Sequence, residues 1–181
     1  PTALAILHAA AIAGASEVLL LSRDKERARE VLDRYVDEFG ALAHATVDLQ
    51  AAVDGHRSFL TAYEQTMFKF GSYTTSTQAI AAADLIINAT PLGMREGDPA
   101  PFDVALFREG QRAFDVVYAH GETAFAAGAK AAGCTFSDGG GMLVAQAVAT
   151  VQAVCDVSGI DCELSFDELF EIMANAANFN V

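Results

Sequence analysis

Residues 83–94 decide the fold class of this chain; they read Ala-Asp-Leu-Ile-Ile-Asn-Ala-Thr-Pro-Leu-Gly-Met. The apolar run 85–87 is typical of a buried strand. It stops at Asn88 and Thr90, and Pro91 cannot donate a hydrogen bond to a neighbouring strand. In a parallel α/β sheet, ligands bind beyond the carboxyl ends of the strands. The stretch is therefore predicted to be a strand that ends at the wall of a ligand site.

On both sides of this stretch, short apolar runs alternate with patterns of helical period. Such alternation predicts a parallel sheet wound on both sides by helices, a Rossmann-like α/β fold, here as one domain over residues 1–181. The expected strands are residues 18–21, 85–87, 114–118 and 134–137. The expected helices are residues 3–13, 28–39, 76–82, 102–107, 122–132 and 142–157, and a last helix that Ser165 and Glu168 cap.

The segment 41–81 has the least regular pattern. Residues 43–49 are expected to form a short strand, and residues 71–77 a polar turn. An apolar helical face is expected between them, formed by Phe59, Leu60, Tyr63, Met67 and Phe70. No function is predicted for this segment.

Composition restricts the class of protein. A hydrophobic content of 52% with 19% charged residues in 181 residues favours a globular domain over a disordered chain. The net charge of −13 argues against a nucleic-acid or membrane partner, although a local basic pocket can still exist. The apolar stretch 3–21 lacks a preceding basic residue and is interrupted at residues 14, 16 and 17. A buried helix followed by a strand is therefore favoured over a signal peptide.

The three cysteines, Cys134, Cys155 and Cys162, have no paired spacing that would suit zinc. Their odd number argues against a disulfide framework. We expect reduced thiols and a cytoplasmic protein. The sequence also lacks a nucleophile elbow and a phosphate-loop lysine motif, and no metal site is predicted.

Polar residues follow four of the expected strands at their carboxyl ends. Because these ends lie on one edge of a parallel sheet, the residues are expected to line one crevice. They are Ser22 and Arg23, Asn88 and Thr90, Tyr118, and Asp138 with Gly139.

Arg23 and Arg27 support the sharpest single inference from these positions. In dinucleotide-binding folds, an arginine after the second strand accommodates the 2′-phosphate of NADP, whereas an acidic residue there holds the ribose of NAD. Both arginines could equally belong to an ordinary solvated helix start. Asp24 would oppose a phosphate yet could hold a ribose hydroxyl, so NAD stays possible.

The glycine-rich turn 138–142 opens a predicted helix. Its backbone amides could cradle an anion or let a flat ring approach the backbone. Gln146 lies about one turn inside that helix. It would either face the crevice or be a core glutamine bonded to the backbone.

Taken together, these motifs resemble the cofactor-binding domain of shikimate and quinate dehydrogenases. Residues 88–94, 115–118 and 138–146 match in the order and roughly at the spacing of that family, and residues 18–27 resemble its strand and basic NADP-binding turn. The resemblance covers residues 1–40 and 82–157. Segment 41–81 is longer than the corresponding connection in the family.

The resemblance implies a role for each matching position. The 2′-phosphate of NADP would be held at the end of the first expected strand, and the nucleotide and nicotinamide would follow along the other strand ends. The cofactor-binding residues would be Ser22, Arg23, Arg27, Asn88, Ala89, Thr90, Val116, Gly139 and Met142, and Tyr118 and Gln146 would reach the substrate.

Some positions depart from the family. Ala119-His120 replaces the usual Asn-Pro, and Gly140 stands where leucine is common. The family's first strand and pyrophosphate-binding glycine loop would lie before Pro1, and its catalytic lysine and aspartate further upstream. We therefore expect a fragment of a longer chain that holds none of the catalytic residues.

The expected function is that of the cofactor-binding portion of an oxidoreductase, which reversibly reduces 3-dehydroshikimate to shikimate, or a quinate-type acid, with NADPH. Its partner would be a small shikimate-type molecule, and the sequence leaves the oligomeric state open. Two alternatives remain: an NAD-dependent quinate/shikimate dehydrogenase, and a non-catalytic regulatory homologue that senses a dinucleotide.

Overall fold

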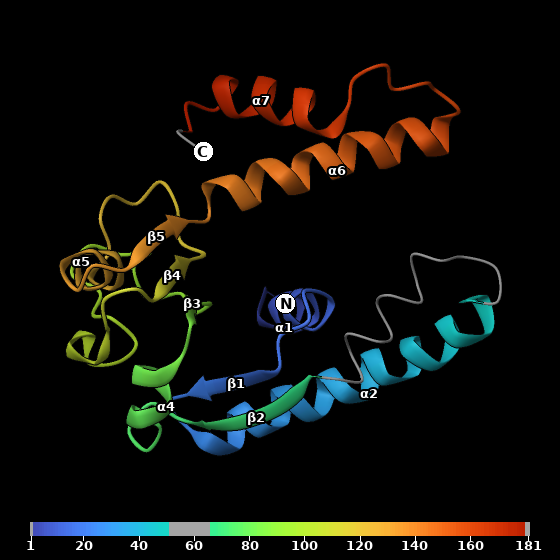
Figure 1. The fold of residues 1–181 in the computed structure, drawn as a ribbon. Coiled ribbons are helices and arrows are strands. Elements are labelled where there is room, and N and C mark those ends of the chain that lie inside the picture. Colours follow the sequence, from blue (N-terminus) through green and yellow to red (C-terminus); the bar gives the residue numbers. More distant parts are fainter. Residues whose placement is uncertain (1, 51–65, 180–181) are drawn as a thin grey trace. The chain divides into compact units, whose positions relative to one another are not determined.

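The computed structural model describes residues 2–50 and 66–179, and side chains in these ranges except at 39–50 (Figure 1). The chain divides into two compact units, unit 1 (Pro1–Ala79) and unit 2 (Ile80–Val181). Each is described by itself below. The prediction of one domain over residues 1–181 stays a prediction.

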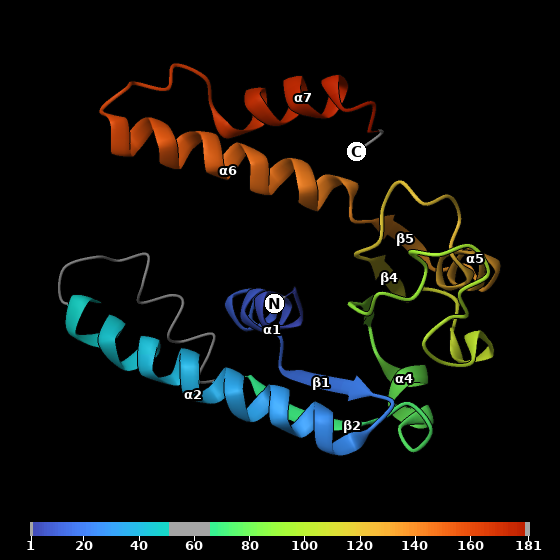
Figure 2. The same ribbon diagram turned by 180° about the vertical axis from the view of Figure 1, so that it is seen from behind.

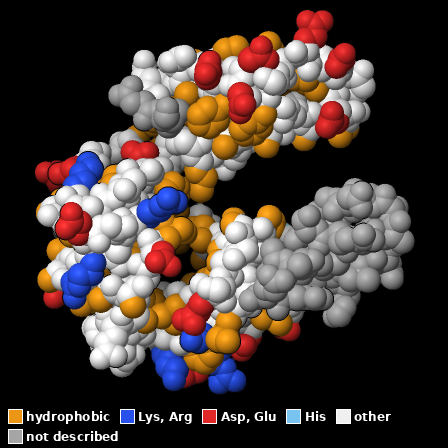
Figure 3. All heavy atoms as spheres, in the orientation of Figure 1, with side chains coloured by type: hydrophobic (Ala, Val, Ile, Leu, Met, Phe, Trp, Pro, Cys, Tyr) orange, Lys and Arg blue, Asp and Glu red, His pale blue; other side chains and the backbone are white. Residues whose placement is uncertain are grey.

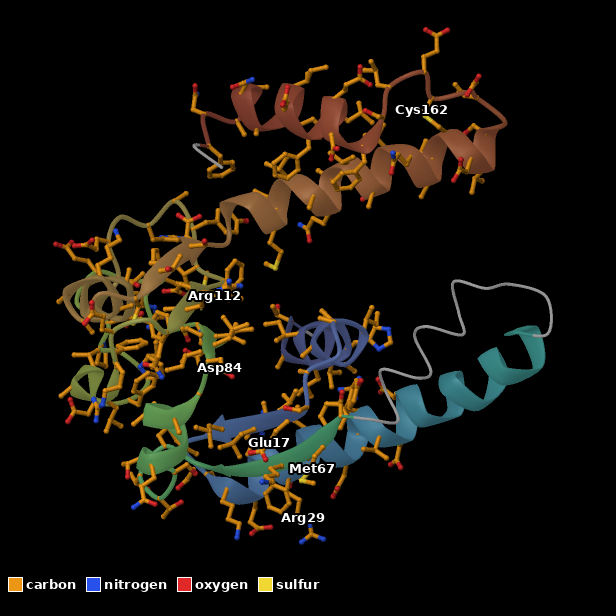
Figure 4. The ribbon with its side chains drawn as sticks, in the orientation of Figure 1. Glu17, Arg29, Met67, Asp84, Arg112 and Cys162 are labelled. Atoms are coloured by element: carbon orange, nitrogen blue, oxygen red, sulfur yellow. The ribbon has the colours of Figure 1, made fainter. Side chains whose placement is uncertain are left out.

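Unit 1 is built on two parallel strands. Its elements are α1 (Thr2–Ile12), β1 (Glu17–Ser22), α2 (Lys25–Gln50) and β2 (Met67–Ser72). The strands pair in register from Glu17 opposite Met67 to Ser22 opposite Ser72, and Figure 4 labels the first of these pairs. Because the strands are parallel, their carboxyl ends, at Ser22 and Ser72, lie side by side.

The core of unit 1 lies between this sheet and the two helices (Figure 2). Leu7 of α1 and Leu32 and Tyr35 of α2 are its buried residues. They pack on one face of the sheet because alternate strand residues point to the same side. That face carries Val18, Leu20, Phe68 and Phe70.

Two sequence predictions in this unit are wrong. Residues 43–49 are not a strand, because α2 continues past Gly40 to Gln50. A glycine inside a helix costs only about 1 kcal/mol relative to alanine, and the residues after it are mostly good helix formers. Met67 and Phe70 are not on a helix but in β2, where Phe68 and Phe70 alternate with exposed Met67. The other positions of that predicted helical face lie outside the described residues.

Unit 2 holds the stretch from which the fold was predicted. Its elements begin with α4 (Thr77–Ala82), which starts just before the boundary, and β3 (Leu85–Asn88). They continue with η1 (Val104–Leu106), β4 (Arg112–Asp115), α5 (Ala124–Ala131), β5 (Thr135–Asp138), α6 (Gly140–Ser158) and α7 (Phe166–Ala176). The strands form a parallel sheet in the order β3-β4-β5, with Asn88, Asp115 and Asp138 aligned at their carboxyl ends.

The third expected strand is shorter than predicted. β4 ends at Asp115, so Tyr118 lies three residues beyond it. The physical reason is local: the Val117 amide donates to the Asp115 carboxylate at 3.1 Å instead of continuing the strand. The helix expected at 102–107 is a single 3-10 turn, η1. The α/β class and the parallel pairing are confirmed, whereas the missing first strand stays a prediction.

Aromatic residues form the core under the three strands. Phe107 and Phe125 lie 5.2 Å apart between ring centroids, and Phe102 packs against both. Ala113 of β4 and Ala129 of α5 complete the buried cluster. The core thus fixes α5 against one face of the sheet and leaves the strand ends free for a site.

The last two helices pack on each other through Val144, Val148 and Ala174. The predicted cap of α7 is confirmed, since Ser165 and Glu168 form a reciprocal capping box.

In the described part of the chain, α6 is the one helix long and apolar enough to cross a membrane, a test that core helices of globular proteins also pass. No lysine or arginine follows Lys130 in the sequence. Figure 3 shows acidic side chains on the surface of α6 and α7.

Candidate functional site

The carboxyl edge of the unit 1 sheet is lined by hydroxyl groups. After β2 the chain turns back, and the Tyr73 amide donates to the Ser22 carbonyl at 3.3 Å. The Ser72 hydroxyl lies 3.1 Å from that of Thr74 and 2.9 Å from that of Thr75. The polar turn expected at 71–77 is therefore beside the end of β1, a proximity that the sequence did not predict.

The same edge is locally basic. Residues 23–29 hold four of the 11 lysines and arginines of the chain. Arg23 and Arg27 are exposed, and neither forms an ion pair with a carboxylate in the described ranges. Burial raises the pKa of Tyr73, and the nearby Arg23 charge lowers the pKa of Tyr73 by a smaller amount. Figure 3 shows basic side chains gathered at the start of α2.

Asp24 has a structural task at this edge. Its Oδ1 accepts the Glu26 amide at 3.0 Å, which is the hydrogen bond of a helix N-cap. One carboxylate oxygen is therefore engaged with α2. The neighbouring Arg29 differs from Arg23 and Arg27, because it pairs with Glu26 at 3.9 Å and Asp33 at 3.5 Å. The two arginines predicted for phosphate binding thus make no ion pair among the described residues, and neither does Lys25, whose ammonium group lies 5.6 Å from the centroid of the Phe70 ring.

The strand ends of unit 2 are joined by a buried polar network. Asp115 is fully buried, and its Oδ1 accepts from the Asn88 side-chain amide at 2.9 Å and from the Val117 amide at 3.1 Å. Its Oδ2 accepts from the Thr123 hydroxyl at 2.8 Å. Thr123 in turn accepts the Ala126 amide at 3.0 Å and so caps α5. One carboxylate therefore ties β3, β4 and α5 together.

Asn88 shapes the loop that follows β3. Its Oδ1 accepts from the Thr90 amide at 3.1 Å and from the Thr90 hydroxyl at 2.7 Å. Its Nδ2 donates to the Leu92 carbonyl at 3.1 Å as well as to Asp115. A side-chain amide offers two donors and two acceptor lone pairs, so that of Asn88 is fully used. Its side chain positions half-buried Ala89 and Thr90 and has no hydrogen bond left for a ligand.

Gly139 is required by close packing. A Cβ atom on it would overlap the Val116 carbonyl and lie 3.2 Å from the Tyr118 ring. Its φ of −75° suits any residue, so only the missing side chain explains the glycine. The contact brings three predicted site residues together, at the ends of β4 and β5. The next amide, of Gly140, donates to Asp138 at 2.9 Å and is therefore occupied.

Met142 and Gln146 lie on the first turns of α6. Met142 is half-buried, whereas Gln146 is exposed. Among the described residues, the Gln146 side chain makes no hydrogen bond, and only its backbone carbonyl accepts from Thr150 at 2.8 Å. The interpretation of Gln146 as a core glutamine is therefore wrong. Its predicted contact with substrate stays a prediction.

Sequence reasoning missed Phe179. Its ring meets the Tyr118 ring edge-on at 6.0 Å and would lie 3.0 Å from a Cβ on Gly140. The chain reverses after α7 because Asn178 has a φ of 56°, and the Phe179 amide returns to the Ala174 carbonyl at 3.1 Å. An asparagine just past a helix is a known signal for this turn. Asp115 and Thr123 were missed as well, although a threonine before a helical pattern signals a cap.

The predicted site residues thus form two groups. Ser22, Arg23 and Arg27 lie at the edge of unit 1. The ends of β3, β4 and β5 in unit 2 bring together Asn88, Ala89, Thr90, Val116, Tyr118 and Gly139, with Met142 on the first turn of α6. Within the described ranges, no three histidine, cysteine or acidic residues are placed to bind a metal ion. Unit 1 therefore offers an exposed basic edge, and unit 2 offers strand ends whose polar side chains are bonded to one another.

Known proteins resemble this chain over most of its length. It is 36% identical over 148 residues to a shikimate dehydrogenase (NADP(+)) of Moorella thermoacetica, a match that covers 80% of this chain and 42% of that protein. It is 44% identical over 69 residues to a quinate/shikimate dehydrogenase (NAD(+)) of Corynebacterium glutamicum (strain R), which covers 38% of this chain and 24% of that one. The chain therefore spans less than half the length of these relatives. No family model matches it.

The fold is similar to that of solved dehydrogenases. The quinate dehydrogenase from Corynebacterium glutamicum in complex with NAD superposes with a TM-score of 0.64 at 24% identity, over 97% of this chain and 52% of that one. At this identity the likeness concerns the fold alone, and it agrees with a Rossmann-like domain. The sequence matches fall roughly in the C-terminal portion of the relatives. The chain belongs to the shikimate/quinate dehydrogenase family.

Proposed function

We propose that this chain is the cofactor-binding portion of an NADP-dependent oxidoreductase that reversibly reduces 3-dehydroshikimate to shikimate or acts on a quinate-type acid. Family membership supports the reaction class, because the relatives named above are shikimate and quinate dehydrogenases. The chain spans 42% of the length of the first of them. A cytoplasmic location is part of the same proposal.

One observation carries the choice of cofactor: Arg23 and Arg27 are exposed and make no ion pair in the described part of the chain. In a protein of net charge −13, two exposed guanidinium groups that make no ion pair among the described residues favour an anionic ligand. A guanidinium group can bind a phosphate through two parallel hydrogen bonds. The hydroxyls of Ser72, Thr74 and Thr75 add donors at the same edge.

The residues present therefore fit the 2′-phosphate end of NADP. Ser22, Arg23 and Arg27 would hold that group. When bound, the nicotinamide supplies the hydride, which is the cofactor's own chemistry. The protein's part is to hold and orient it, and we assign no proton-transfer residue to this chain.

Unit 2 has a positioning role in this proposal. The Asn88–Asp115–Thr123 network fixes the loop after β3, and Gly139 fixes the distance between the ends of β4 and β5. Val116, Gly139 and Met142 would then contact the nicotinamide, and Tyr118 and Gln146 would reach the substrate. Rigid support of this kind is what orientation of a reacting group requires.

An NAD-dependent quinate/shikimate dehydrogenase is the second candidate. The relative in Corynebacterium glutamicum is named for NAD(+), and Asp24 is the residue that could hold a ribose hydroxyl. Against it, one Asp24 oxygen caps α2. A non-catalytic regulatory homologue that senses a dinucleotide is the third hypothesis, since Ala119-His120 replaces the Asn-Pro that is usual in the family.

The test compares NADPH and NADH on the purified chain by the fluorescence of the reduced nicotinamide. We expect NADPH to bind more tightly by about tenfold or more, the value of one charge-assisted hydrogen bond. Equal affinity or a preference for NADH would contradict the cofactor assignment. We also expect no oxidation of shikimate by this chain alone; turnover would contradict the absence of catalytic residues from it.

A protein that extends this chain to the length of its relatives separates the enzyme from the sensor. Reduction of 3-dehydroshikimate with NADPH by that longer protein is expected. Tight NADPH binding without turnover of shikimate or quinate would instead favour the regulatory homologue.

A further inference from the structure

The end of α6 brings two cysteines together. The helix ends at Gly159 in the left-handed conformation, with a φ of 66°. The Ile160 amide then donates back to the Cys155 carbonyl at 2.9 Å, so the chain reverses directly over the last turn. Cys162 follows only two residues later, within roughly 7 Å of extended chain. Figure 4 shows it in the connection that follows α6.

The two thiols lie close enough to interact. Burial raises the pKa of the Cys155 thiol, and the Cys162 side chain raises it further. The Cys162 thiol donates to the Leu164 carbonyl at 3.7 Å. Both side chains are partly exposed, so a small reagent can reach them.

The connection is also anchored on both sides. The capping box of Ser165 and Glu168 fixes the start of α7, and the Ser165 backbone amide donates a hydrogen bond to the Glu168 carboxylate at 2.8 Å. Packing of α7 on α6 holds the two helices together. The connection that carries Cys162 is therefore fixed at both ends by the fold.

We propose that Cys155 and Cys162 form a redox-active dithiol site that closes to an intramolecular disulfide by exchange with a low-molecular-weight disulfide. Such bonds need Cα atoms within about 7 Å. The reversal at Gly159 returns the chain to the Cys155 carbonyl only two residues before Cys162. The site is distinct from the dinucleotide edge and does not depend on the proposed function.

The exchange has two steps. The Cys162 thiolate attacks one sulfur of the reagent, forming a mixed disulfide and releasing one small thiolate. Cys155 then loses its proton, attacks the Cys162 sulfur and releases the second small thiolate. The two protein thiols lose two electrons and two protons in total, and the reagent is reduced to two thiols.

The order of attack follows from the environment of Cys155. Burial, the Cys162 sulfur and the Asp156 carboxylate all raise the pKa of the Cys155 thiol, with burial first. Cys155 therefore keeps its proton longer and acts second. The exposed acidic neighbours Asp156, Asp161 and Glu163 repel anionic reagents, so the site favours a cationic disulfide.

The test treats the intact chain with cystamine, which is cationic, and in parallel with oxidised glutathione, which is anionic. With cystamine, we expect the count of free thiols to fall from three to one. The mass of the chain should fall by two hydrogens, and peptide mapping should show a disulfide between Cys155 and Cys162. The reaction with oxidised glutathione is expected to be slower at equal concentration.

Three variants decide the assignment. Cys155→Ser and Cys162→Ser should each stop at a stable cystamine adduct on the remaining cysteine of the pair. Cys134→Ser is the matched control, because the Cys134 thiol bonds to the Arg108 carbonyl at 3.3 Å and belongs to another core; it should close the disulfide like the parent.

Two results would overturn the proposal. One is separate adducts on both cysteines of the folded parent chain. The other is a disulfide that involves Cys134 or links two chains. Circular dichroism of each serine variant establishes that it is folded, so a failure to react cannot be assigned to unfolding.

Discussion

The polar residues of the two units are used in opposite ways. In unit 2, Asn88, Asp115 and Thr123 are buried and bonded to one another, and the Asn88 amide has no hydrogen-bonding capacity left. In unit 1, Arg23 and Arg27 are exposed and carry charges that no carboxylate of the described residues neutralises.

This difference separates support from binding. Buried polar groups that satisfy each other fix a geometry, and removing one leaves its partners unsatisfied. Open charges contribute little to folding and are available to a ligand. We therefore expect substitutions in unit 2 to change stability, and substitutions at the unit 1 edge to change cofactor affinity.

Asp115→Ala is expected to have the largest effect on stability. It leaves the Asn88 amide, the Val117 amide and the Thr123 hydroxyl without their acceptor, which should cost about 3 kcal/mol of unfolding free energy. Urea denaturation of the chain measures this cost. Asp161→Ala, at an exposed position, should change stability by less than about 0.5 kcal/mol. Similar values for the two would contradict the network.

Arg23→Ala and Arg27→Ala should act on binding instead. Each is expected to weaken NADPH binding by about tenfold while leaving NADH binding and stability nearly unchanged. Arg29→Ala is the matched control, because Arg29 is exposed but paired with Glu26 and Asp33. An equal loss with Arg29→Ala would mean that only the summed charge matters.

Ala119 offers a smaller, stabilising test in unit 2. It has a φ of 59°, a conformation that disfavours alanine and that asparagine tolerates better. Ala119→Asn should raise the unfolding free energy by about 0.5 kcal/mol, and Ala119→Val should lower it. Thermal unfolding of both variants measures the change, and the opposite ranking would contradict the backbone geometry at this residue.

The smallest effect is expected from His8 in unit 1. Burial lowers the pKa of His8 below its ordinary value of 6.5 in the folded chain. The unfolded state therefore binds more protons, so stability should fall as the pH drops through 6.5 and level off below the folded pKa. Urea titrations between pH 5 and 8 measure this slope. The dependence of the unfolding free energy on pH should be smaller in His8→Gln and unchanged in His120→Gln.

The sequence predicted most of the architecture, because apolar period and strand-end residues are local signals. The strand at Leu85–Asn88, the cap at Ser165 and the basic turn after β1 all follow from residues close in the sequence. Residues 43–49 were misjudged because Gly40 does not end a helix when good helix formers follow it, and Met67 and Phe70 because β2 depends on tertiary packing. Phe68 and Phe70 reveal a strand only when Val18 and Leu20 lie opposite them.

The roles at the site were harder to predict than its location. Asn88 was expected to line the nucleotide path, yet its side chain is bonded on all sides by Thr90, Leu92 and Asp115. Phe179 was not expected at all, because its contact with Tyr118 joins residues 61 positions apart, the difference between 179 and 118. Strand-end patterns locate a site edge, but only three-dimensional contacts show which side chains remain free.

Binding of adenosine 2′,5′-bisphosphate, compared with adenosine 5′-phosphate, tests the central claim most directly. The two ligands differ only in the phosphate that Arg23 and Arg27 are proposed to hold. By calorimetry, we predict that the bisphosphate binds at least about tenfold more tightly and that Arg23→Ala with Arg27→Ala removes the difference. Equal affinity of both ligands for the unmodified chain would contradict the account.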